Sequence, residues 1–301
     1  MKKAEIARQL WDNLWEDYSR RVEYARIYQQ MIEEAGGAIA NDHIAFRSLR
    51  LTLDLPTGKI NLGISYLASI VEALGYEAAG EYQFPDQHLY ARHYRHPEQD
   101  RYDLPKLFIS ELVLDALPNS LVRQIEATVS YSEFFEVNSL KKDFSAAELQ
   151  TAFTRPWKPP TRSLVEAVNQ VSQYGAWVLL HGYAVNHFTG YINRQNTPAY
   201  PDIESTARIL AQRGIPMKDA IEGSRGSGLR QTATQAVTEM VAVWDEEKGE
   251  LTEIPWTYAY YEIAERNAIE IAPGKTELFQ GFLNAQAKNL FEMTKTALGD
   301  R

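Results

Sequence analysis

Two strand-like runs that each carry a histidine open two similar stretches of this chain. Residues 42–49 read DHIAFRSL and contain His43, and residues 176–192 read AWVLLHGYAVNHFTGYI and contain His187. In each half an amphipathic, helix-like run follows (INLGISYLASIVEALGY, then IESTARILAQRGIP), and after it come further strand-like runs. The last of these carries Glu111 in the first half (LFISELVL) and Glu262 in the second (YAYYEIAER). This order predicts two similar units, each made of a strand, a helix and further strands.

The segments around the two units predict helices and a linker. Apolar residues recur every four positions near the N-terminus and indicate a helical region over 1–36, which EEAGG ends. TELFQGFLNAQAKNLFEMTKTAL predicts a C-terminal helix over 276–298, and the proline-rich 153–163 reads as a linker. We therefore expect a single domain over residues 1–301, with repeat halves at about 40–135 and 175–275.

Composition excludes several classes of partner and chemistry. A formal net charge of −9 argues against nucleic acid, whose binding depends on clustered Lys and Arg. No stretch approaches 18 uninterrupted apolar residues and the charged N-terminal stretch lacks a signal-peptide core, so we expect no membrane partner and a cytoplasmic location. The chain has no cysteine, so disulfides and thiolate chemistry are ruled out. A bound metal would need His, Asp or Glu ligands.

His43, His187 and Glu262 are the candidate metal ligands. Strands that begin equivalent units can lie side by side about a pseudo-twofold axis, which would bring the two histidines together. A carboxylate inside the apolar run YAYYEIAER is costly unless it is paired or binds a cation. Two histidines and one carboxylate with open positions form the facial triad of non-haem Fe(II) oxygenases. The alternatives are hydrogen-bonded core histidines and an ion pair of Glu262 with an arginine.

Arg47 is the candidate residue for holding a substrate. In a strand it shares a face with His43 and Ala45, so its guanidinium could lean toward the metal and clamp a carboxylate bidentately. The alternative is an arginine on the surface of a strand. The glycine-rich 221–232 (IEGSRGSGLRQT) does not match a phosphate-binding loop, and it reads as a flexible loop that leads into a strand. Arg230 and Gln231 in this segment are further candidate substrate contacts.

Other polar residues fit less reactive roles. His88, His93 and His96 lie among arginines and turn residues, which suits the solvated end of a hairpin better than a metal site. Glu265 would face away from Glu262 and into solvent.

The motifs DHIAFRSL, PKLFISEL, NHFTGYI and YYEIAER occur in an order that resembles the 2-oxoadipate dioxygenase/decarboxylase (2-hydroxyglutarate synthase) family. The resemblance covers about residues 1–295. It implies an α+β fold of vicinal-oxygen-chelate type, in which paired βαβββ units form a metal-enclosing sheet and further helices pack at both termini. YYEIAER is also similar to a strand of 4-hydroxyphenylpyruvate dioxygenases that carries an iron-ligating glutamate, which favours Glu262 over Glu265.

Carried over residue by residue, the resemblance implies that His43, His187 and Glu262 hold Fe(II) and that Arg47 binds substrate in the catalytic site. Zn, Ni or Mn could occupy the same ligands after purification. The implied partners are a 2-oxo dicarboxylate and dioxygen; 2-oxoadipate would yield 2-hydroxyglutarate and CO2. The glycine- and arginine-rich 221–232 departs from the family pattern, and the chain is shorter than the longer bacterial members. A different 2-oxo acid therefore stays open as substrate.

Two other functions stay open at this point. A glyoxalase-like isomerase or lyase would use the same ligands with Ni(II), Zn(II) or Mn(II) and would not consume oxygen. A non-catalytic dicarboxylate-binding protein would gain thermal stability from ligand without forming product. Nothing in the sequence predicts an oligomeric state.

Overall fold

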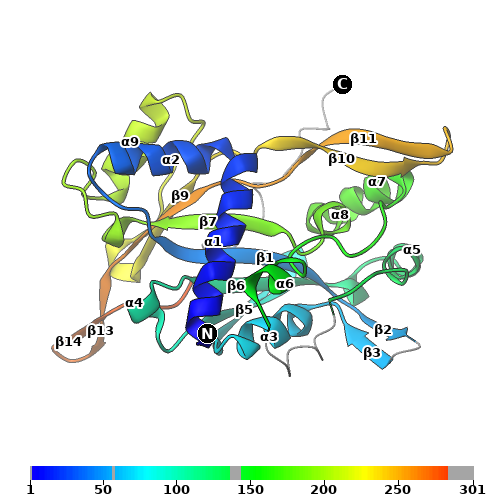
Figure 1. The fold of residues 1–301 in the computed structure, drawn as a ribbon, viewed down its shortest axis with the longest axis horizontal. Helices are drawn as coiled ribbons and strands as arrows, with labels where there is room; N and C mark the ends of the chain where they lie inside the picture. Colours follow the sequence, from blue (N-terminus) through cyan, green and yellow to red (C-terminus); the bar gives the residue numbers. More distant parts are fainter. Residues whose placement is uncertain (1, 56–57, 136–143, 284–301) are drawn as a thin grey trace.

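The computed structural model describes residues 2–55, 58–135 and 144–283, and its centre is one curled, mixed sheet (Figure 1). The eight strands lie in the order β4-β5-β6-β1-β7-β12-β9-β8. Their bounds are β1 Asn41–Arg50, β4 Glu77–Phe84, β5 Leu89–Arg95, β6 Lys106–Val113, β7 Val185–Tyr191, β8 Glu222–Ser224, β9 Leu229–Ala233 and β12 Glu262–Arg266.

The sheet consists of two halves with the same order of strands. From the centre outward, the first half runs β1, β6, β5, β4, and the second runs β7, β12, β9, β8. In each half the two central strands are parallel, and the halves join where β1 pairs with β7 in antiparallel fashion. α3 (Ile64–Ala73) follows β1, and α9 (Ile203–Gln212) follows β7. The predicted order of a strand, a helix and further strands in each half is confirmed.

One face of the central strands packs against the N-terminal helices. α1 (Lys3–Arg21) crosses these strands in Figure 1 and is followed by α2 (Glu23–Glu34). Trp11 of α1 contacts Phe46 of β1, with ring centroids 6.3 Å apart, and Trp15 contacts Phe188 of β7 at 5.2 Å. Because side chains alternate along a strand, His43, three positions from Phe46, and His187, next to Phe188, are directed to the opposite, inner face of the sheet.

The structure corrects two predictions about helices. The N-terminal helical region is interrupted at Val22, between α1 and α2. The run AWVLLH is not a strand but the C-terminal part of the helix α8 (Gln173–His181). The Ser172 hydroxyl caps the N-terminus of this helix by accepting a hydrogen bond from the Gly175 N–H at 3.1 Å. Gly182, with a φ of +63°, follows that helix, so His181 shares no strand with His187. A short apolar run fits a buried helix as well as a buried strand, which explains the error.

The predicted linker and C-terminal helix also differ from the structure. Trp157, inside the predicted linker 153–163, is buried, and its indole N–H donates to the Leu179 carbonyl at 2.8 Å. Residues 276–278 belong to β14, and the predicted helix from residue 284 onward lies outside the described residues.

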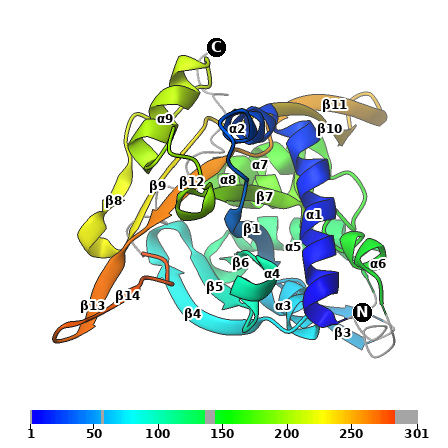
Figure 2. The ribbon, with the colours of Figure 1, turned by 60° about the vertical axis from the view of Figure 1, so that its left-hand side comes forward.

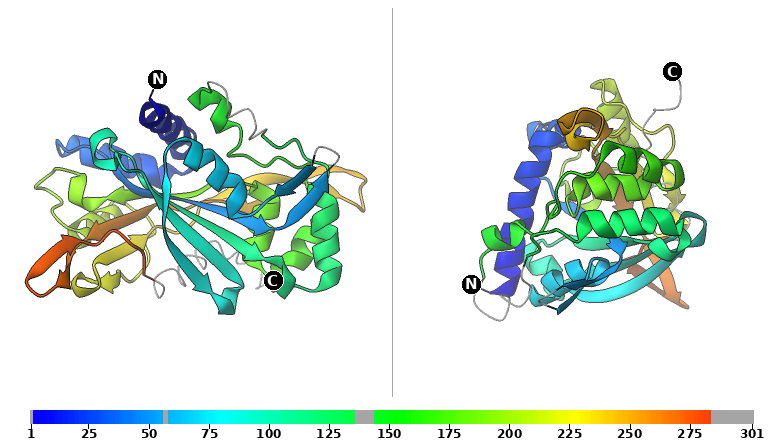
Figure 3. Two further views of the ribbon diagram at one scale, coloured as in Figure 1. Left: turned by 90° about the horizontal axis from the view of Figure 1, so that it is seen from below. Right: turned by 90° about the vertical axis from the view of Figure 1, so that its right-hand side faces the viewer.

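The remaining elements surround the sheet. They are β2 Thr52–Leu55, β3 Gly58–Asn61, α4 Gln99–Tyr102, α5 Asn119–Val129, α6 Ala146–Gln150, α7 Arg162–Val171, β10 Thr238–Asp245, β11 Glu250–Thr257, β13 Ala268–Ala272 and β14 Lys275–Leu278. β10–β11 and β13–β14 form two-stranded ribbons that project from the sheet (Figures 2 and 3). Among the described residues, every helix is too short or too polar to cross a bilayer.

Candidate metal centre

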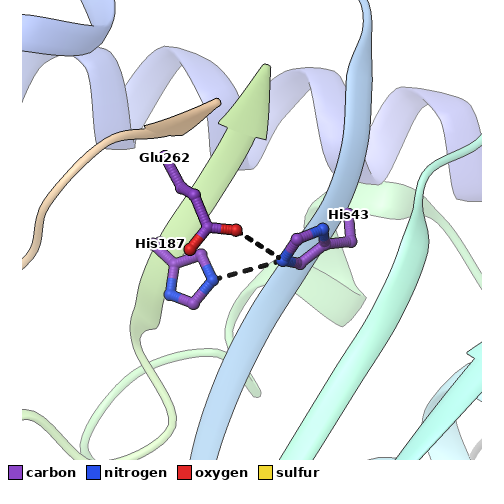
Figure 4. A group of neighbouring side chains, drawn as sticks. All are labelled: His43, His187 and Glu262. Atoms are coloured by element: carbon purple, nitrogen blue, oxygen red, sulfur yellow. Dashed lines mark hydrogen bonds and ion pairs between the residues drawn. The ribbon is translucent and has the colours of Figure 1, made fainter. Parts of the chain in front are cut away.

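His43, His187 and Glu262 converge on the inner face of the sheet from three adjacent strands, β1, β7 and β12 (Figure 4). Thr189 of β7 pairs with His43 on one side and with Glu262 on the other, so the strand register itself brings these groups together. The Nε2 atoms of the two histidines are 3.4 Å apart, and His43 Nε2 lies 3.3 Å from Glu262 Oε1. All three side chains are at most 3% exposed.

A hydrogen bond at Nδ1 fixes each imidazole. His43 Nδ1 lies 2.8 Å from Asp42 Oδ2, and His187 Nδ1 lies 3.1 Å from Asn186 Oδ1. Both partners are acceptor oxygens, so each Nδ1 carries the proton and, in a neutral ring, Nε2 offers a lone pair. Sequence reasoning missed Asp42 and Asn186. Their signal was present, because each directly precedes a histidine at matching places in the two halves.

The electrostatic environment differs between the two histidines. Burial, with the charges of His43 and Arg47 nearby, holds the pKa of His187 well below its usual value, so this ring is neutral at pH 7. Burial acts in the same direction on His43. However, hydrogen bonds and charges from Asp42 and Glu262 outweigh it and raise the pKa of His43. In the metal-free protein the carboxylates therefore stabilise a proton at the place where a metal cation would bind.

The three residues fit a divalent transition metal. Two ligand atoms about 2.0–2.2 Å from one ion, at angles of about 90–110°, are about 2.8–3.6 Å apart, and the separations here are 3.3 and 3.4 Å. Glu262 Oε1 accepts a hydrogen bond from the Thr189 hydroxyl at 3.2 Å. Glu262 Oε2 is buried and has no hydrogen-bond partner among the described residues. An uncompensated buried carboxylate oxygen beside two imidazole nitrogens is suited to a cation.

Arg47 lies beside this centre, as its place on β1 predicts. Its guanidinium carbon is 4.9 Å from the Trp177 ring centroid and 5.0 Å from that of Tyr174, and the side chain is 1% exposed. Arg47 and His187 line the same small cavity. Tyr260 also lines it and stacks on the His187 imidazole with ring centroids 4.7 Å apart. The cavity thus brings a fixed guanidinium and a candidate metal ligand to one space.

The two candidate substrate contacts on β9 lie on opposite faces of the sheet. Gln231 pairs with Ala264 and so shares the inner face with Glu262; its amide is buried and has no hydrogen-bond partner among the described residues. Arg230 pairs with Glu265 on the outer face, where its guanidinium lies 3.2 Å from that carboxylate. The structure therefore brings Gln231, but not Arg230, to the side of the candidate metal centre. The prediction that Glu265 is solvated is wrong, because it is 8% exposed in this ion pair.

The comparison of Glu111 with Glu262 also needs correction. Glu111 accepts a hydrogen bond from the Ile64 N–H at the start of α3, and Glu265 does the same for Ile203 at the start of α9. Glu111 is therefore the counterpart of Glu265. The counterpart of Glu262 in the first half is Phe108, three residues before Glu111 in β6. Phe108 pairs with Ala45 of β1 at the position where Glu262 pairs with Thr189 of β7. Only the second half contributes a carboxylate to the centre.

Two of the histidines predicted to be solvated are buried. His93 is 3% exposed and His96 is 5% exposed, whereas His88 is exposed in the turn before β5. His93 Nδ1 lies 2.8 Å from the Tyr82 hydroxyl, and His96 Nε2 lies 3.2 Å from the Leu74 carbonyl. His96 therefore lies in the core of the first half, whereas His93 also packs against Phe282, with ring centroids 5.3 Å apart.

Comparison with known proteins identifies the family. The family model for 2-oxoadipate dioxygenase/decarboxylase matches residues 8–298. A chloroplastic 2-oxoadipate dioxygenase/decarboxylase from Arabidopsis thaliana is 28% identical over 272 residues, which cover 84% of this chain and 67% of the relative.

Solved structures agree with this match. The hydroxyglutarate synthase from Oryza sativa, in complex with 2-oxoadipate, is 25% identical with a TM-score of 0.77, over 97% of this chain and 93% of that one. A protein assigned to the glyoxalase superfamily from Ralstonia eutropha JMP134 shares the fold, with a TM-score of 0.77 at 22% identity over 94% of this chain and 87% of that one. The chain is an α+β protein of vicinal-oxygen-chelate type and belongs to the 2-oxoadipate dioxygenase/decarboxylase family of enzymes.

Proposed function

We propose that this protein is an Fe(II)-dependent dioxygenase/decarboxylase of a 2-oxo dicarboxylic acid, with 2-oxoadipate as the leading substrate. The observation that carries the proposal is the buried group of His43, His187 and Glu262 beside the cavity that Arg47 lines. The names of the Arabidopsis and rice relatives, and the 2-oxoadipate bound to the rice protein, support the substrate class.

His43, His187 and Glu262 would hold the metal, and three protein ligands leave positions open for substrate and dioxygen. Bound Fe(II) would supply coordination sites for the 2-oxo acid and for dioxygen, together with the electrons that activate dioxygen. The net reaction converts 2-oxoadipate and O2 to 2-hydroxyglutarate and CO2.

The side chains of the cavity would bind and orient the acid. The buried Arg47 guanidinium lies against Trp177 and Tyr174 of α8, at 4.9 and 5.0 Å from their ring centroids, and these contacts restrict its orientation before substrate arrives. A planar guanidinium binds a carboxylate through two parallel hydrogen bonds, which fixes its direction as well as its position. The buried Gln231 amide offers one donor group and one acceptor group on the same face of the sheet. Tyr260 covers the His187 ring and limits access of water to it.

The test is oxygen uptake by protein loaded anaerobically with Fe(II) and then given 2-oxoadipate and air, with 2-hydroxyglutarate assayed in the same sample. We expect uptake and product in equal amounts, with both lost in His187→Ala. His96→Gln is the matched control, because His96 is a buried histidine in the core of the first half. Its activity should stay close to that of the wild type.

Other outcomes would point to other functions. Uptake with a different 2-oxo acid would retain the chemistry and replace the substrate. Substrate turnover without oxygen uptake would favour a metal-dependent isomerase or lyase. A rise in Tm with 2-oxoadipate but no product, in protein with a full iron site, would favour a binding protein.

A further inference from the structure

The Asp42 carboxylate links a candidate metal ligand to a buried guanidinium. Its Oδ2 lies 2.8 Å from His43 Nδ1. Arg266 donates to both carboxylate oxygens, from Nε to Oδ1 at 2.5 Å and from Nη2 to Oδ2 at 2.8 Å. Asp42 is 2% and Arg266 1% exposed. Because the guanidinium of Arg266 binds both oxygens, the Asp42 carboxylate cannot rotate away from the His43 imidazole without breaking this ion pair.

The second histidine has a weaker partner. His187 Nδ1 faces a neutral amide oxygen, that of Asn186, at 3.1 Å. An anionic acceptor at Nδ1 increases the electron density at Nε2 more than a neutral acceptor does, and it fixes the tautomer more firmly. His43 is therefore the better oriented and more basic of the two imidazoles.

Arg266 also holds the chain segment that covers His43. Its Nη1 donates to the carbonyl oxygens of Phe279 and Gly281, at 3.0 and 2.9 Å. The ring of Phe282, which follows directly, packs edge-on against the His43 imidazole with centroids 4.8 Å apart. The Arg266 guanidinium thus orients both the Asp42 carboxylate, which binds His43 Nδ1, and the segment that places Phe282 against the His43 ring.

We propose that Asp42 and Arg266 are positioning residues that keep His43 protonated at Nδ1, with Nε2 directed at the metal, and that they thereby set the metal affinity of the centre. This proposal rests on the function proposed above, because it requires His43, His187 and Glu262 to bind a metal. A purely structural ion pair between β1 and β12 would change stability but leave metal affinity untouched.

Metal affinity distinguishes the two roles. Asp42→Asn keeps an oxygen near His43 but removes the negative charge; its Kd for Zn(II) and Co(II) is measured in competition with a chromophoric chelator. We expect affinity to fall about 10–100-fold and the visible absorption bands of bound Co(II) to change. Glu265→Gln is the matched control. Like Asp42, Glu265 is a buried carboxylate that pairs with an arginine, but it belongs to β12 and lies on the outer face of the sheet. Its affinity should stay within about twofold of wild type.

Removal of Asp42 alone leaves two buried cations without their carboxylate, Arg266 and Lys106, whose Nζ lies 3.9 Å from Asp42 Oδ1, and this can prevent folding. The double variant Asp42→Asn/Arg266→Gln removes the carboxylate together with the guanidinium that it binds and leaves Lys106 in place, and it should show the same loss of affinity with a folded chain. Arg266→Lys keeps the charge but loses the fork, so we expect a smaller loss.

Wild-type affinity and an unchanged Co(II) spectrum in a folded Asp42→Asn or double variant would overturn the proposal. Metal binding that depends on Asp42, in a protein that consumes no oxygen with any 2-oxo acid, would overturn the proposed function and leave the positioning role intact. A wild-type chain that binds no metal would overturn both.

Discussion

Arg47 is an uncommon residue for the interior of a sheet, because a guanidinium is costly to bury without compensation. The rings of Trp177 and Tyr174 lie about 5 Å from its guanidinium, which lines the cavity beside His187. A lysine at this position would keep the charge but present a single ammonium group in place of a planar fork. An Arg47→Lys substitution therefore separates the contribution of the positive charge to substrate binding from that of the planar guanidinium.

For Arg47→Lys we expect kcat/KM for 2-oxoadipate to fall about 10–100-fold, since a hydrogen bond to a charged group contributes about 1.5–3 kcal/mol. Metal affinity should not change, because Arg47 is not a ligand. Steady-state oxygen uptake and chelator competition measure the two quantities.

Arg230→Lys is the matched control for this exchange. Arg230 is bound to Glu265 on the outer face, so its replacement should leave kcat/KM within about twofold. Loss of activity in Arg230→Lys, with Arg47→Lys unaffected, would assign substrate binding to β9 instead.

At this scale the sequence pointed to three residues that the structure brings together, and it missed residues that contact them. His43 and His187 could be matched because each sits in the first strand of its half, and Glu262 because it interrupts an apolar run. The pairing of Asp42 with Arg266 joins residues 224 positions apart, and it depends on how β1 and β12 are placed in the sheet. No local pattern in the sequence carries that information.

The segment after β14 covers the inner face of the sheet at the His43 side of the centre. Backbone groups hold it: Arg266 binds two of its carbonyls, and the Phe282 N–H donates to the Tyr82 hydroxyl at 3.1 Å. Phe282 is 7% exposed and packs against His43 and Phe108. The ring therefore fills space next to the candidate metal centre.

Phe282→Ala should lower the free energy of unfolding by about 3–4 kcal/mol, because loss of a buried phenyl ring removes transfer energy and leaves a cavity. The opened space should also let a chelator remove the metal faster. Urea unfolding and the rate of metal loss to a chelator test both effects. Tyr131→Ala is the control: Tyr131 is 79% exposed, and its removal should change stability by less than about 0.5 kcal/mol. Equal behaviour of the two variants would contradict the assigned role of Phe282.

Elements were predicted well where apolar and polar residues alternate with a clear period and poorly where an apolar run has none. The order of strands and helices in both halves followed from periodicity. The helix α8 was missed because its run of apolar residues is buried on all sides and so shows no polar face. The match of Glu111 to Glu262 failed for a different reason. Three positions separate Glu262 from Glu265, and only the capping of α3 and α9 reveals which of them Glu111 resembles.

For the whole molecule, His181 links stability to pH. Burial, with Arg21 nearby, lowers its pKa to about 3. In the unfolded chain its pKa is about 6.5, so below that pH the unfolded chain binds a proton that the folded protein does not. The free energy of unfolding should therefore fall as pH decreases from 6.5 toward 3, by up to about 1.4 kcal/mol per pH unit from this residue.

Urea unfolding of the metal-free protein at several pH values measures this slope. His181→Gln, which cannot be protonated, should show a smaller slope over the same range. His88→Asn is the control: His88 is exposed with a φ of 56°, which Asn tolerates, and its slope should match that of the wild type. An unchanged slope in His181→Gln would show that His181 does not contribute to acid unfolding.

At the level of the whole fold, the sequence predicted the α+β class and the paired units, and the curled sheet agrees. It did not predict β14, because residues 276–278 were assigned to the start of a C-terminal helix whose remainder from residue 284 lies outside the described residues.

The convergence of β1 and β7 has a further consequence for a chain that contains no cysteine. An ion bound to His43 and His187 would act as a cross-link between residues 144 positions apart. A cross-link that closes so long a loop strongly lowers the conformational entropy of the unfolded chain. For a disulfide over a loop of this size, the resulting stabilisation of the folded state is about 4–5 kcal/mol. A bound metal would then stabilise the fold as a reversible cross-link between the two halves, in addition to its part in the proposed reaction.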